Sequence, residues 1–141
     1  MVPVSTLAAL ALPAPGERVL AAIDARMGEV YLGAFARRGD ALELLQAEAV
    51  VRPDAASVPA GAWSGVGTGF AAADGALAAR LGAALVQVDA AALPHAADVA
   101  RLAAAAFARG EVLAPERLEP AYLRNDVALT LAQQQALRDA R

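Results

Sequence analysis

Two apolar runs separated by one tight turn constrain the fold of this chain most strongly. Residues 19–24 form the first run, Arg26-Met27-Gly28-Glu29 has the composition of a turn, and residues 30–37 resume strand-like residues. Alternation assigns the second run two faces: Val30, Leu32, Ala34 and Ala36 against Tyr31, Phe35 and Arg37. Because both faces are largely apolar, we expect a central strand that is covered on both sides. The pattern predicts a β-hairpin inside a layered α/β or α+β domain.

A third strand is expected at residues 41–50, directly after the turn Arg38-Gly39-Asp40. The polar positions of this segment change parity between Leu44 and Leu45. A shift of one residue exchanges the two faces of a strand, so the change predicts a β-bulge that turns both hydrophobic sets toward the core.

Two short helices are expected on either side of this hairpin region. At the N-terminus, we expect the end of a strand followed by a helix whose cap is Ser5 or Thr6. Residues 13–16, which include two prolines and a glycine, are expected to end this helix. After the third strand, Asp54 is expected to cap the other short helix.

Strand and helix then alternate along the chain. Short strands are expected at residues 62–66 and 84–88, with a helix at residues 70–81 between them and Gly82 as its terminator. The longest helix is expected at residues 94–109, where apolar residues recur at the amphipathic spacing. These residues are Val99, Leu102, Ala103, Ala106 and Phe107.

The C-terminal part shows weaker patterns. Residues 113–125 are punctuated by prolines and are expected to be extended. Residues 129–141 are rich in Gln and Ala, and we expect a frayed helix there.

Composition and charge exclude several classes of function. The 141 residues suffice for one domain, and 15 acidic against 12 basic residues give a net charge of −3. Without a concentrated basic face, strong autonomous binding to nucleic acid is not expected. The absence of cysteine excludes disulfides, thiolate catalysis and cysteine-ligated metal. No segment has the pattern of a membrane span or signal peptide, so we expect a cytoplasmic protein without a membrane partner.

Two groups of polar residues are candidates for contact with a ligand or a partner. Asp24, Arg26 and Glu29 surround the hairpin turn, and the alternative is a local charge network without a binding role. Tyr122 and Arg124 lie in the extended C-terminal segment. An exposed Tyr and Arg are typical of an interface, and packing of an edge strand is the alternative.

A third candidate is the turn Gly67-Thr68-Gly69 between a predicted strand and a predicted helix. Its backbone N–H groups could lie close to a phosphate, and the alternative is a tight turn that needs glycine dihedral angles. The motif lacks the third glycine of a dinucleotide fingerprint and the lysine of a P-loop. His95 is the single histidine, and we expect a surface position for it rather than a metal ligand or base. No complete catalytic or metal-binding constellation is present, which disfavours enzyme activity by this chain alone.

Four segments, taken together, resemble one known protein family. The two specific ones are residues 19–31 and Glu119-Pro120-Ala121-Tyr122-Leu123-Arg124-Asn125, and the other two are Val4-Ser5-Thr6-Leu7 and Val66-Gly67-Thr68-Gly69-Phe70. They occur in the same order and at similar spacing in the TsaB (YeaZ) family. The chain is similar to that family from Val2 to about Ala128.

The resemblance implies one lobe of a two-lobed fold of the actin-like, sugar-kinase type. It assigns residues 1–128 to the C-terminal lobe, with residues 1–12 derived from the segment between the lobes, and residues 129–141 to a tail. The opening Ile-Asp-Thr strand of the family's N-terminal lobe has no counterpart here. The expectation is therefore a truncated member without that lobe.

The resemblance also implies a function. Family members are non-catalytic subunits that help a TsaD-like catalytic subunit and a TsaE-like ATPase to form threonylcarbamoyladenosine at position 37 of ANN-decoding tRNAs. ATP and metal are then expected to bind to those partners, and no cofactor is expected on this chain. A homodimer is possible where the N-terminal lobe is present. Two alternatives stay open: a nucleotide-binding half-domain that uses Gly67, Thr68 and Gly69, and a peptidase of the "glycoprotease" type. The sequence contains no nucleophile–base pair of the kind that a peptidase would need.

Overall fold

The predicted hairpin forms the centre of a five-stranded sheet. A computed structural model describes residues 1–124, 135, 136, 138 and 139 of the chain. Strands β1 (Arg18–Arg26) and β2 (Glu29–Arg38) pair antiparallel across the turn, with Val19 opposite Phe35. The hairpin and its turn are therefore confirmed.

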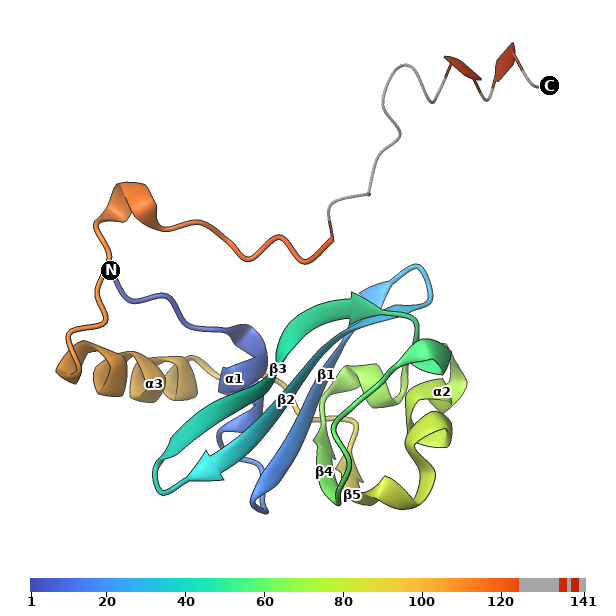
Figure 1. Cartoon of the computed structure of the whole chain (residues 1–141), viewed down its shortest axis with the longest axis horizontal. Helices are drawn as coiled ribbons and strands as arrows, with labels where there is room; N and C mark the ends of the chain where they lie inside the picture. The colour runs from blue at the N-terminus through green and yellow to red at the C-terminus, as the bar shows by residue number, and fades with distance from the viewer. Residues whose placement is uncertain (125–134, 137, 140–141) are drawn as a thin grey trace.

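Three further strands complete a mixed sheet in the order β3-β2-β1-β4-β5. β3 (Ala41–Val51) pairs antiparallel with β2, whereas β4 (Trp63–Val66) is parallel to β1 and β5 (Leu85–Asp89) is parallel to β4. Because parallel neighbours need a crossover connection, helix α2 (Ala72–Leu81) lies between β4 and β5 in the chain. The predicted α/β class is confirmed (Figure 1).

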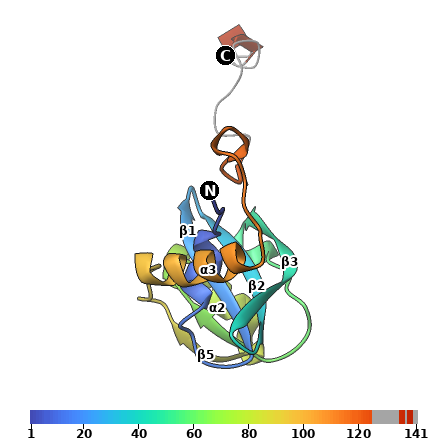
Figure 2. The same cartoon turned by 90° about the vertical axis from the view of Figure 1, so that its left-hand side faces the viewer.

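Helices cover both faces of the sheet (Figures 1 and 2). α1 (Thr6–Ala11) packs on one face and α2 on the other, while α3 (Ala96–Ala108) packs against α1. The α2-side core consists of Leu20, Ala22, Val30, Leu32, Ala34, Ala56, Trp63, Phe70 and Leu77. The α1-side core consists of Leu7, Leu10, Ala11, Ala14, Val19, Ala21, Phe35 and Val66. Consecutive side chains of β1 therefore enter opposite cores, which explains why the hairpin is apolar on both faces.

β3 carries the bulge that the change of parity predicts. Phe35 pairs with Leu44 and the neighbouring Ala34 pairs with Gln46, so the register skips Leu45. Leu45 packs against the α2-side core. The expectation that both hydrophobic sets turn inward is wrong at Leu44, which stays 48% exposed because β3 is an edge strand.

Helix α1 begins as predicted, and Ser5 is its cap. The Ser5 hydroxyl oxygen accepts hydrogen bonds from the backbone N–H groups of Leu7 and Ala8 at 3.1 and 3.2 Å. The predicted strand end before this helix is wrong. Met1 and Leu113 instead exchange backbone hydrogen bonds away from the sheet, at 2.5 and 2.8 Å.

Asp54 does not cap a helix, which corrects a second expectation. The short helix after β3 is a single 3-10 turn, Pro53–Ala55, whose N-cap is Arg52. Asp54 is the second residue of that turn, and its carboxylate accepts hydrogen bonds from Arg52 at 3.1 and 3.2 Å. The two oxygens that a capping residue would use are therefore bound to the arginine. The described residues include three more 3-10 turns, at Thr68–Phe70, Gly82–Ala84 and Pro115–Arg117.

The helix predicted at residues 70–81 is interrupted near its start. Ala73, Asp74 and Gly75 have φ angles of 49°, 55° and 76°, all in the left-handed region. Asp and Gly adopt this region more readily than most residues, and a periodicity of apolar side chains does not reveal it. Leu77 reaches the α2-side core, and Gly82 ends the helix with a φ of 49°, as predicted.

α3 confirms the longest predicted helix, but its apolar stripe is not a core face. Ala106 is buried, whereas Val99 is 38% and Phe107 is 68% exposed, because only one side of the helix meets α1. Residues 113–124 are extended apart from one 3-10 turn, as predicted. The helix predicted at residues 129–141 falls largely outside the described residues. No helix of the described part is long and apolar enough to cross a membrane.

Candidate interaction site at the β1–β2 turn

The turn between β1 and β2 is held by its own aspartate. Arg26, Met27 and Gly28 all have left-handed backbone angles, with φ of 63°, 56° and 75°. Asp24 Oδ1 accepts a hydrogen bond from the backbone N–H of Arg26 at 2.8 Å, and Oδ2 accepts one from Arg26 Nη1 at 3.1 Å. These bonds offset the cost of a left-handed backbone at two non-glycine residues, about 1–2 kcal/mol each. The local charge network expected as an alternative for Asp24 and Arg26 is present.

Arg124 joins this turn from the far end of the chain. Its Nη1 donates to the carbonyl oxygen of Ala25 at 2.8 Å, and its Nη2 donates to Glu29 Oε2 at 2.5 Å. The guanidinium carbon lies 5.9 Å from the centre of the Tyr31 ring, and the side chain is only 14% exposed. The structure therefore brings together two groups of candidate residues that the sequence analysis treated as separate.

The Gly67-Thr68-Gly69 turn packs directly against β1. The Thr68 hydroxyl oxygen accepts a hydrogen bond from the backbone N–H of Asp24 at 3.1 Å. A Cβ atom on Gly67 would lie 2.2 Å from the carbonyl oxygen of Ala22, and one on Gly69 would lie 2.7 Å from the Ala22 Cβ. Close backbone approach therefore accounts for both glycines. The assignment of this turn to a phosphate stays a prediction.

Three side chains of the site remain open to solvent. The Arg26 side chain is 86% exposed, and Met27 and Tyr122 are 77% and 73% exposed. Tyr, Arg and Met are enriched at protein interfaces because each combines apolar area with adaptable contacts. With the carboxylates of Asp24 and Glu29 each paired to an arginine, the arrangement suits binding of a partner surface. We refer to Arg26, Met27 and Tyr122 as the turn surface.

His95 lies at the N-cap of α3, is exposed and makes no side-chain capping bond, which confirms its surface position. Within the described residues, no group of three or more His, Asp or Glu side chains could hold a metal ion.

Comparison with known proteins defines the class first. No family model matches the sequence. Two solved structures from Pseudomonas aeruginosa do match: a protein similar to the peptidase YeaZ, with a TM-score of 0.74 and 42% identity, and YeaZ, with a TM-score of 0.73 and 41% identity. These matches cover 86% and 85% of this chain and 57% of each relative. The mixed sheet and its helices are therefore those of an actin-like fold.

A curated protein shows the same similarity. The tRNA threonylcarbamoyladenosine biosynthesis protein TsaB of Escherichia coli (strain K12) is 39% identical over 142 aligned residues, which span 91% of this chain. The chain is therefore similar to TsaB (YeaZ) proteins over about nine tenths of its own length. It spans 58% of the length of that curated relative.

Proposed function

We propose that this chain acts in the biosynthesis of threonylcarbamoyladenosine in tRNA, as part of a TsaB-like subunit. The observation that carries the proposal is the 39% identity to the Escherichia coli protein of that name across 91% of this chain. In this proposal the chain is non-catalytic, and a TsaD-like subunit with a TsaE-like ATPase carries out the transfer to adenosine 37 of ANN-decoding tRNAs. ATP and metal are bound by those partners.

The proposal assigns the chain to the C-terminal lobe of such a subunit. Residues 1–128 supply the lobe, residues 1–12 come from the segment that joins the lobes, and residues 129–141 form a tail. The match to 57% of each solved relative and the sheet with two cores of its own support this assignment.

Within the proposal, the turn surface contacts a partner. The Arg124–Glu29 ion pair and the Asp24 hydrogen bonds hold the turn in one conformation, so little conformational entropy is lost when a partner binds. Exposed Arg, Met and Tyr side chains supply the contact area. A second copy of the subunit would be the alternative partner.

The experiment is a hybrid protein, in which this chain replaces the matching region of the Escherichia coli TsaB. Binding of the hybrid to purified TsaD is measured by calorimetry, with and without the double substitution Arg26→Ala and Tyr122→Ala. We expect the double variant to bind about tenfold more weakly or worse, because Arg and Tyr are enriched among the interface residues whose truncation costs about 2 kcal/mol or more. Arg38→Ala is the matched control, since that arginine is also largely exposed (68%, against 86% for Arg26) but pairs with Glu43 on the β2–β3 hairpin. Equal affinity of all three proteins would remove the turn surface from the proposal.

A further inference from the structure

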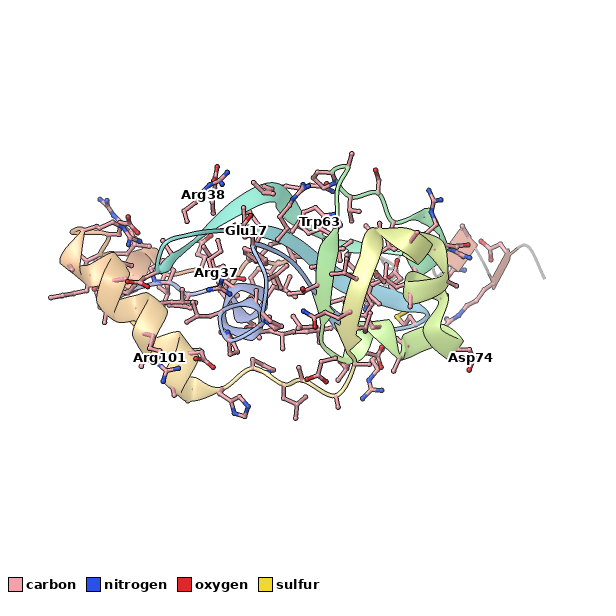
Figure 3. All side chains as sticks on the ribbon, turned by 90° about the horizontal axis from the view of Figure 1, so that it is seen from below. Glu17, Arg37, Arg38, Trp63, Asp74 and Arg101 are labelled. Carbon is pink, nitrogen blue, oxygen red and sulfur yellow. The ribbon has the colours of Figure 1, made fainter. Side chains whose placement is uncertain are left out.

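A cleft lies between α3 and the β2–β3 turn, at the other end of β2 from the turn surface. Its volume is about 530 Å³, which is within the range of small-molecule sites. Leu12, Leu42, Leu102 and Ala105 give it an apolar lining. Five charged side chains complete the walls: Arg37, Asp40, Asp98, Arg101 and Arg109. Figure 3 shows Arg37 beside α1 and Arg101 on α3.

Arg37 is a fixed cation with spare hydrogen-bonding capacity. Its Nη2 donates to the carbonyl oxygens of Leu12 at 3.0 Å and Ala14 at 2.7 Å, and its Nε donates to that of Gly16 at 3.3 Å. Within the described residues, no carboxylate lies within ion-pair distance of Arg37 and Nη1 has no hydrogen-bond partner. Half-buried and without a negative counter-charge, this guanidinium would gain from a bound anion.

The opposite wall holds a buried carboxylate. The Asp98 side chain is only 5% exposed, and its Oδ1 accepts a hydrogen bond from Arg101 Nη1 at 2.7 Å. No bond to Oδ2 is made by any of the described residues. The Arg101 side chain is 71% exposed and can turn part of its guanidinium toward the cleft. Arg109 instead forms an ion pair with Glu111, with 2.6 Å between Nε and Oε1. The cleft therefore offers donors on Arg37 and Arg101 and an acceptor on Asp98.

We propose that this cleft binds a small organic molecule that carries a phosphate or carboxylate group. Arg37 and Arg101 hold the anionic group, because charge-assisted bonds from two guanidinium groups compensate its loss of water. The free Asp98 oxygen accepts a hydrogen bond from a hydroxyl or amine next to that group. The apolar lining contacts the rest of the molecule. This site is independent of the partner contacts assigned to the turn surface.

The test uses the complete chain labelled with nitrogen-15. Inorganic phosphate and citrate are titrated separately at constant ionic strength, and NMR follows the Arg37 Nε–H and the backbone amides of α3. Saturable changes in chemical shift at both positions support the site. The anion that causes them shows whether the site prefers a phosphate or a carboxylate group. We expect Arg37→Gln and Arg101→Gln each to raise the apparent dissociation constant about tenfold, because each substitution removes one charged hydrogen bond to the anion. Arg38→Gln, one residue further along β2 and paired with Glu43, should leave it unchanged.

Two results would overturn the proposal. One is a linear shift without saturation for both anions, which would show only general ionic effects. The other is saturable binding that Arg101→Gln leaves unaltered. Because Arg37 also holds the loop after α1, Arg37→Gln could unfold the protein. The Arg101→Gln variant, whose side chain is largely exposed, then decides the question alone.

Discussion

Arg124 and Glu29 form an ion pair across 95 residues of sequence, with Arg124 Nη2 at 2.5 Å from Glu29 Oε2. The same guanidinium donates to the Ala25 carbonyl oxygen, so it fastens the C-terminal segment to the β1–β2 turn. Both segments carry residues of the turn surface. The position of Tyr122 relative to Arg26 therefore depends on Arg124.

Replacing Arg124 should release the C-terminal segment. We expect Arg124→Gln to lower the free energy of unfolding by about 2 kcal/mol, since it removes a partly buried ion pair and leaves Glu29 without its partner. Hydrogen exchange should accelerate at residues 118–124 and in the β1–β2 turn. Arg26→Gln is the control, because Arg26 pairs with Asp24 through a side chain that is 86% exposed. This substitution should change the free energy of unfolding by less than about 1 kcal/mol. Equal effects of the two substitutions would contradict this role for Arg124.

The glycine at position 67 should tolerate no side chain. Its φ is 107°, and a Cβ would lie 2.2 Å from a backbone oxygen, so we expect Gly67→Ala to destabilise by about 3 kcal/mol or more. Gly39→Ala separates backbone strain from collision, because φ there is 61° and no atom lies within 4 Å of the added Cβ. Its cost should stay near 1 kcal/mol. Chemical denaturation measures both values, and similar losses would show that collision with β1 is unimportant.

A matched pair of leucines tests the core on the α1 side. Leu10 is 1% exposed, and we expect Leu10→Ala to cost about 2–5 kcal/mol through lost burial and a cavity. Leu44 is 48% exposed on the edge strand, so Leu44→Ala should cost less than about 1 kcal/mol. Denaturation midpoints give both numbers. A small loss at Leu10 would mean that α1 is not part of the core.

One prediction concerns pH. The hydrogen bonds from Arg109 lower the pKa of Glu111 below its ordinary value of 4.5. Because the pKa is lower in the folded state, the pair stabilises the fold above the unfolded pKa, and this contribution is lost as the pH falls through the folded value. In an NMR titration, Arg109→Gln should raise the pKa of Glu111 toward 4.5. The pKa of Asp54, which Arg52 lowers, should not move, and a Glu111 titration unaffected by the substitution would exclude the pairing.

Local patterns were sufficient for much of the fold. Alternation along residues 19–37 predicts the hairpin and its two covered faces, and the parity change at Leu44 locates the bulge. The spacing of apolar residues predicts α3 but not its exposure, because periodicity reports which residues share a face and not what covers that face. The left-handed residues at 73–75 have no periodic signature.

Most of the candidate site depends on contacts that no local pattern contains. The residues of the β1–β2 turn and of the C-terminal segment could each be chosen from residue type, but their pairing through Arg124 is a tertiary contact. Residue type alone marks neither Asp98 nor Arg37 as a binding residue, and alternation predicts Arg37 only as a strand residue. Their meeting at one cleft follows from the packing of α3 against α1, which the sequence does not reveal.

The most direct measurement is the amount of threonylcarbamoyladenosine in total tRNA of an Escherichia coli strain depleted of its own TsaB. The strain expresses the hybrid in which this chain replaces the matching region of the Escherichia coli protein. We predict that the hybrid restores the modified nucleoside, because this chain supplies the portion it matches at 39% identity. A hybrid that accumulates as folded protein but leaves the nucleoside absent would contradict the proposed function.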